Sequence, residues 1–143
     1  MSDVLFVCVH NAGRSQMAKA LFSHAAQRQG LPLRAESAST EPGGHVRPVV
    51  AQAIREIGLE VSQEQPKLIT NEMVSGATKV ITMGCQVDAD KCPAVFIKGV
   101  EDWGLPDPKD MPLPQVRALR EDIQRRVEEL LAALVRADKT STG

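Results

Sequence analysis

The residues best suited to chemistry are Cys8, Arg14 and Ser15, which form a C-x5-R-S segment directly after the apolar run from Val4 to Val7. Such a run is typical of a buried strand, so we expect a strand to end near Cys8 and a helix to begin near Arg14. Backbone N–H groups that converge between a strand and a helix N-terminus bind anions. The segment therefore predicts an oxyanion-binding loop with a nucleophilic thiolate at its base.

The residue types in this loop suit a tetrahedral oxyanion. Arg14 offers a planar pair of donors to two oxygens. The positive environment should hold the pKa of the Cys8 thiol well below its usual value of about 8.5. The predicted substrate-binding residues are Val9, His10, Asn11, Ala12, Gly13, Arg14 and Ser15. The alternatives are a buried strand-end cysteine beside an ordinary surface arginine, and a His10 without a chemical role.

The composition indicates an ordinary soluble domain. The 143 residues carry 17 Lys and Arg against 18 Asp and Glu, and no polybasic block suggests nucleic acid or an anionic membrane as a partner. No window approaches the roughly 18 apolar residues of a membrane span, and no signal peptide is recognisable. We expect a cytoplasmic monomer with a single domain at 1–138 and a disordered tail at 139–143.

Predicted strands and helices alternate along the chain. Apolar periodicity predicts strands at 4–7, 33–39, 78–83 and 94–98, and helices at 17–30, 49–58, 68–77 and 116–134. This alternation is typical of an α/β fold with a parallel sheet covered on both faces. Ligands bind beyond the carboxyl ends of such strands. We therefore expect Cys8, Cys85 and the loop that contains Asp107 to meet at one edge of the sheet.

Two further cysteines follow the third predicted strand. Three cysteines without a signal peptide favour reactive or metal-binding thiols over a structural disulfide framework. The six residues between Cys85 and Cys92 fit neither a thioredoxin-type C-x2-C motif nor a zinc ribbon. In a helix these thiols would lie about 10 Å apart, beyond disulfide reach, so joining them requires the segment to bend or unwind.

Asp107 lies between Pro106 and Pro108, which stiffen its loop and can hold a carboxylate over the anion site. A general acid there would protonate a leaving oxygen. Asp102 and Asp110 compete for this role, and an Asp-Pro pair that only forms a turn is the simpler alternative.

With these residues identified, the sequence resembles the thioredoxin-coupled arsenate reductases built on the low-molecular-weight protein tyrosine phosphatase fold. The resemblance rests on the segments 8–18, 83–94 and 102–108 and covers nearly the whole chain. It implies a three-layer α/β fold with a four-stranded parallel sheet flanked by helices. It also implies a redox enzyme that needs no metal and no cofactor.

The resemblance further implies a relay of three thiols. Cys8 attacks arsenate while Asp107 protonates the departing oxygen, and Arg14 and the loop hold the adduct. Cys85 then attacks Cys8, which releases arsenite and leaves a Cys8–Cys85 disulfide. Cys92 attacks Cys85 in turn, and the resulting Cys85–Cys92 disulfide is presented to thioredoxin. Such exchange requires successive thiolates within reach of one another.

Two positions depart from the family pattern. Gly13 stands where many relatives carry a further loop cysteine, which the relay does not need. Lys19 stands where some thioredoxin-coupled relatives place a glutamate that helps to bind potassium. An ammonium group at this position argues against that cation site.

Two other functions compete with arsenate reduction. A protein tyrosine phosphatase would use Cys8, Arg14 and Asp107 without Cys85 or Cys92, but the chain contains no tyrosine to grip an aromatic substrate beside the Asp-Pro pair. A non-catalytic metalloid-binding protein would use the three thiolates as soft ligands. It would have no use for Arg14 and converging amides.

Overall fold

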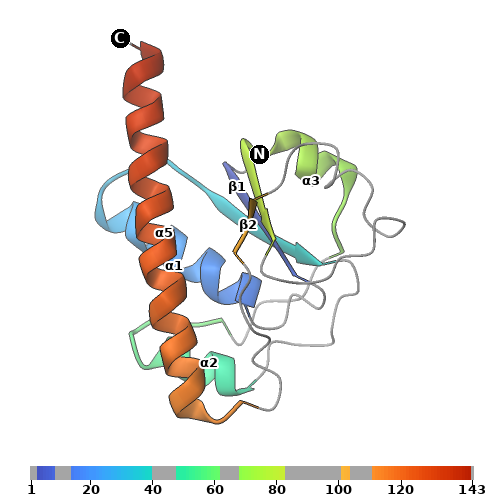
Figure 1. Ribbon diagram of the computed structural model, residues 1–143, viewed down its shortest axis with the longest axis vertical. Coiled ribbons are helices and arrows are strands. Elements are labelled where there is room, and N and C mark those ends of the chain that lie inside the picture. The colour runs from blue at the N-terminus through green and yellow to red at the C-terminus, as the bar shows by residue number, and fades with distance from the viewer. Residues whose placement is uncertain are drawn as a thin grey trace.

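The structure, a computed structural model, describes residues 3–8, 14–39, 48–61, 68–82, 101–103 and 111–142. Within these residues, helices surround a small group of strands (Figure 1). In chain order the elements are β1 Val4–Cys8, α1 Arg14–Arg28, β2 Ala35–Ser39, α2 Pro48–Arg55, α3 Asn71–Gly76, β3 Lys79–Thr82, β4 Glu101–Asp102 and α5 Leu113–Thr142.

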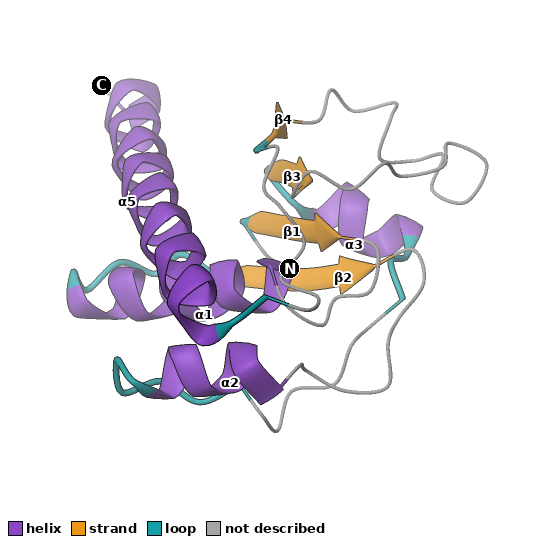
Figure 2. Cartoon of the chain, turned by 60° about the horizontal axis from the view of Figure 1, so that its bottom comes forward, coloured by secondary structure: helices purple, strands orange, loops and turns teal. Residues whose placement is uncertain are grey.

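The four strands form one sheet in the order β2-β1-β3-β4, and every neighbouring pair is parallel (Figure 2). The predicted α/β fold with a four-stranded parallel sheet is thereby confirmed. Because the strands are parallel, their carboxyl ends meet at one edge. The residues that end the strands at this edge are Ser39, Cys8, Thr82 and Asp102.

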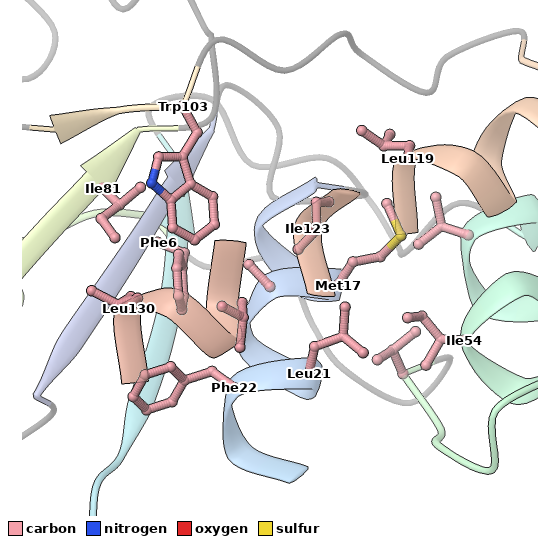
Figure 3. Close-up of a cluster of buried hydrophobic side chains, with 14 of the residues drawn as sticks. Phe6, Met17, Leu21, Phe22, Ile54, Ile81, Trp103, Leu119, Ile123 and Leu130 are labelled. Atoms are coloured by element: carbon pink, nitrogen blue, oxygen red, sulfur yellow. The ribbon is translucent and has the colours of Figure 1, made fainter. Parts of the chain in front are cut away.

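Alternating side chains of β1 enter two different cores, which makes the fold three-layered. Val4 and Phe6 pack in the larger core with residues from α1, α2 and α5, and Figure 3 shows part of this core. Leu5 and Val7 pack in a smaller core, against which Met73 of α3 also lies. All four side chains are fully buried, as a central strand between two helical layers requires.

Two arginines of α5 hold this helix against α2 and against Glu56, the residue that follows α2. Arg120 is 9% exposed, and its Nη1 donates to the carbonyl oxygen of Ala53 at 2.7 Å and to Glu56 Oε1 at 2.9 Å. Glu56 also accepts hydrogen bonds from Arg117. Mainly because of Arg117, the pKa of the Glu56 carboxyl is lowered to about 2.

The strand beside β3 differs from the expectation. The predicted strand at 94–98 lies outside the described residues, whereas Glu101–Asp102, expected to be loop, pairs with β3. These two acidic residues carry no strand propensity. Pairing with Ile81 and Thr82 and the hydrogen bond from Trp103 N to Thr82 O at 2.9 Å define the strand instead.

The boundaries of two helices also differ. The helix expected from Leu68 begins at Asn71, because Leu68 and Ile69 join the sheet edge, where Ile69 N donates to Ser39 O at 2.8 Å. The helix is capped by Thr70, whose hydroxyl accepts a hydrogen bond from Met73 N at 3.1 Å.

At the other end of the chain, α5 runs from Leu113 to Thr142 and so extends beyond both ends of the helix expected at 116–134. Its last turns project past the other elements (Figure 1). None of the described helices combines the length and apolar character needed to cross a membrane.

Candidate active site

The two ends of the predicted anion loop lie where the sequence predicts. Cys8 is the last residue of the central strand β1, and Arg14 is the first residue of α1. The chain between them therefore runs from a strand end to a helix N-terminus, where N–H groups and the helix dipole favour an anion. The predicted ligands Val9, His10, Asn11, Ala12 and Gly13 lie outside the described residues, so their roles stay predictions.

The first turn of α1 is polar and buried. Arg14, Ser15 and Gln16 are 6%, 0% and 2% exposed. Burying a guanidinium is costly unless anionic or polar acceptors surround it. The alternative in which Arg14 is an ordinary surface charge is therefore wrong. A buried arginine at the start of this helix suits the binding of an oxyanion.

Two buried hydroxyl residues end the strands on either side of β1. Ser39 is 0% exposed and lies in register with Cys8, and Thr82 is 6% exposed and lies in register with Val7. Neither residue was predicted from the sequence to belong to the site. The available signal was the pair Ser37 and Ser39, two hydroxyl side chains at alternating positions of a short predicted strand.

Trp103 lies near the edge of the sheet at which the carboxyl ends of the strands meet, and its side chain packs in the larger core (Figure 3). Its side chain is 7% exposed, and its ring centroid lies 5.6 Å from that of Phe6 on β1. Its backbone N–H donates to the carbonyl oxygen of Thr82 on β3, and the guanidinium of Arg126 on α5 lies 6.0 Å from the centroid of its ring. Trp103 thus ties the end of β4 to the two strands that lead toward Cys8 and Cys85.

Three other predicted site residues, Cys85, Cys92 and Asp107, lie outside the described residues. Cys85 follows the end of β3 by three residues, and Asp107 follows the end of β4 by five. Both strands end at the same edge as β1. The topology is therefore consistent with the predicted meeting of these segments, and their chemical roles stay predictions.

Lys19 forms an ion pair that links α1 to β2. Its Nζ lies 3.1 Å from Glu36 Oε1, and the two side chains are 20% and 31% exposed. The ammonium group of Lys19 is therefore paired with a carboxylate of the neighbouring strand. Among the described residues, no group of three or more His, Cys, Asp or Glu side chains could hold a metal ion.

Two of the hollows that described residues line lie along α1. One has a volume of about 210 Å³ and lies between α1 and the segment from Leu59 to Val61. The other has a volume of about 130 Å³ and lies between α1 and α5. Neither is lined by Arg14, Ser15 or Ser39, so we do not assign the chemistry to them.

Comparison with known proteins bears on the same site. The sequence profile of the family described as low molecular weight phosphotyrosine protein phosphatase matches residues 3–140. A putative arsenate reductase of Halobacterium salinarum is 35% identical over 130 residues, covering 87% of each chain.

Two solved structures of arsenate reductases are also similar. One, in a phosphate-binding state, is 30% identical with a TM-score of 0.78, over 93% of this chain and 98% of the other. A thioredoxin-dependent arsenate reductase of Corynebacterium glutamicum is 34% identical with a TM-score of 0.75, over 96% of this chain and 63% of the other.

Proposed function

The chain belongs to the low molecular weight phosphotyrosine protein phosphatase family, and we propose that it is an arsenate reductase that draws its electrons from thioredoxin. One observation carries the proposal. A strand that ends in Cys8 leads to a helix that begins with a buried Arg14, in a chain that carries two more cysteines shortly after the neighbouring strand β3. The named arsenate reductases among its relatives support the same activity.

The first step is nucleophilic substitution at arsenic. The thiolate of Cys8 attacks arsenate, a sulfur–arsenic bond forms, and one oxygen leaves as water after protonation by Asp107. The guanidinium of Arg14 and the amides of residues 9–15 bind the remaining oxygens. The helix dipole of α1 stabilises both the thiolate and the bound anion.

The second step transfers two electrons to arsenic. The thiolate of Cys85 attacks the sulfur of Cys8, the sulfur–arsenic bond breaks, and its electron pair leaves with arsenic as arsenite. The product on the protein is a Cys8–Cys85 disulfide. Cys92 then attacks Cys85 and frees the Cys8 thiolate, and the dithiol of thioredoxin reduces the Cys85–Cys92 disulfide.

This relay fits a cytoplasmic location and a monomeric enzyme. Thioredoxin and its reductase keep thiols reduced in the cytosol, so the three cysteines would be reduced between turnovers. All three proposed thiols belong to one chain, and no residue of a second copy enters the reaction as proposed.

Arsenate turnover with purified thioredoxin, thioredoxin reductase and NADPH tests the proposal. We expect NADPH consumption that depends on arsenate, stops when thioredoxin is omitted, and is much weaker with glutaredoxin and glutathione. Cys8→Ser is the matched control and should abolish turnover. Rapid hydrolysis of p-nitrophenyl phosphate without arsenate turnover would instead identify a phosphatase.

A further inference from the structure

Arg126 carries a charge on the side of α5 that borders the larger core. It follows Ile123 by three residues and precedes Leu130 by four, so the three side chains share one face of the helix. Both apolar residues are buried in the core. A charged group at such a border is unfavourable unless partners compensate for its lost hydration. The structure gives Arg126 two partners, one on α5 and one directly after β4.

The first partner of Arg126 is Asp122, one turn earlier on α5. The Nε atom of Arg126 donates to Asp122 Oδ1 at 3.3 Å, and the two side chains are 36% and 31% exposed. Residues at this i, i+4 spacing are neighbours on a helix surface. The ion pair therefore lies at the edge of the buried region, where the carboxylate restricts the orientation of the guanidinium.

The second partner is the ring of Trp103. The guanidinium carbon of Arg126 lies 6.0 Å from the ring centroid, which fits the distance of about 6 Å for a cation–π contact. The indole is 7% exposed and also packs against Phe6 of β1 (Figure 3). Such contacts are stronger where water is excluded. The end of β4 is therefore tied to α5 through the side chain of Arg126, in addition to its backbone pairing with β3.

The position of Trp103 matters because of the elements that its contacts connect. α5 packs with α1 in the larger core, and α1 begins with Arg14, the proposed oxyanion ligand. Four residues after Trp103 the chain reaches Asp107, the proposed acid. The contact with α5 therefore links the helix layer that positions Arg14 to the start of the segment that carries Asp107.

We infer that Arg126 is a positioning residue of the proposed arsenate reductase. Oriented by Asp122, it holds the indole of Trp103, and with it the end of β4, in a fixed place relative to α1. The part of this inference that concerns the reaction rests on the proposed function. The part that concerns the ring does not, because the contact involves no substrate.

Arg125 offers a matched control. It is the adjacent residue and of the same type, and its Nη2 donates to the same atom, Asp122 Oδ1, at 2.6 Å. The guanidinium over the ring is that of Arg126, whereas the Arg125 side chain is 69% exposed. Arg126→Gln and Arg125→Gln each remove one positive charge and one ion pair from α5. Because both ion pairs are partly exposed to water, both variants should stay folded.

Fluorescence quenching tests the contact with the ring. Trp103 is the one tryptophan of the chain, so quenching of its emission by acrylamide reports on this ring alone. Because Arg126 covers part of the ring, Arg126→Gln should raise the quenching constant by about 1.5-fold to threefold, and Arg125→Gln should leave it within about 1.2-fold. Asp122→Ala removes the orienting carboxylate and should also raise the constant, by less than Arg126→Gln does.

The rate of arsenite release in a single turnover tests the positioning role in the same variants. Arg126→Gln should slow release by about threefold to tenfold, because small misplacements of reacting groups are costly, and Arg125→Gln should stay within about 1.5-fold of the parent. Equal quenching or equal release in these two variants would overturn the inference, and an unchanged quenching constant in Asp122→Ala would overturn the orienting role. A parent that releases no arsenite would refute the proposed function and the positioning role with it, while the quenching results would still decide the contact.

Discussion

Replacing Trp103 with leucine should separate positioning of the site from general stability. The indole is 7% exposed, and its ring contacts Phe6 at 5.6 Å and Arg126 at 6.0 Å. The substitution removes an aromatic pair, a cation–π contact and part of the buried volume. We expect a loss of about 2 to 3 kcal/mol in the free energy of unfolding.

Phe22→Leu is the matched control for this variant. Phe22 is fully buried and contacts Phe6 edge-on at 6.1 Å, but it lies on α1. Trp103, in contrast, immediately follows β4 and precedes Asp107 by four residues. We expect Phe22→Leu to cost about 1 to 2 kcal/mol. Both variants should stay folded at 25 °C if the parent has the usual stability of about 5 to 15 kcal/mol.

The assay compares urea unfolding, followed by circular dichroism, with the rate of arsenite release in a single turnover. If Trp103 holds the end of β4 against β1 and β3, Trp103→Leu should slow arsenite release by about tenfold or more, because small misplacements of reacting groups are costly. Phe22→Leu should change the rate by less than about threefold. Equal rates in the two variants would refute the positioning role and leave Trp103 as a core residue only.

Three other perturbations have defined outcomes. Because the pKa of Glu56 is about 2 in the folded protein, below its usual value of 4.5, its stabilising effect is complete above pH 4.5 and lost as the pH falls toward 2. Urea midpoints of the parent should therefore fall more steeply over this range than those of Glu56→Gln, and parallel curves would argue against this linkage. Asp107→Asn should slow single-turnover arsenite release more than thioredoxin-dependent reduction of the Cys85–Cys92 disulfide; equal slowing would remove its role as the acid. Lys19 places an ammonium group, paired with Glu36, where potassium-binding relatives have a glutamate. Turnover should therefore be the same in KCl and NaCl at equal ionic strength. A clear preference for potassium would show that a cation site exists despite Lys19.

The sequence predicted the fold wherever one pattern dominated. The apolar run before Cys8 and the periodic stripe of α1 specified a strand and a helix that the structure confirms. The position of β4 was not predictable, because Glu101–Asp102 is two residues long, acidic and defined by its pairing with β3. A strand stabilised by tertiary contacts carries little signal in its own residues.

The candidate site was predictable in its chemistry and only partly in its geometry. Cys8 and Arg14 stood out because their types and spacing suit an oxyanion, and both lie at the expected element ends. Ser39 was not singled out, because a serine in a short strand has no distinctive pattern. Its interest comes from register with Cys8, a relation across 31 residues that only the sheet reveals.

The central claim is that three thiols act in the order Cys8, Cys85 and Cys92. Its most direct test is a single turnover of the reduced Cys92→Ser variant with arsenate, followed by quantification of arsenite and peptide mapping of disulfides by mass spectrometry. The relay predicts one arsenite per protein and a trapped Cys8–Cys85 disulfide. Absence of arsenite, or arsenite without that disulfide, would contradict it.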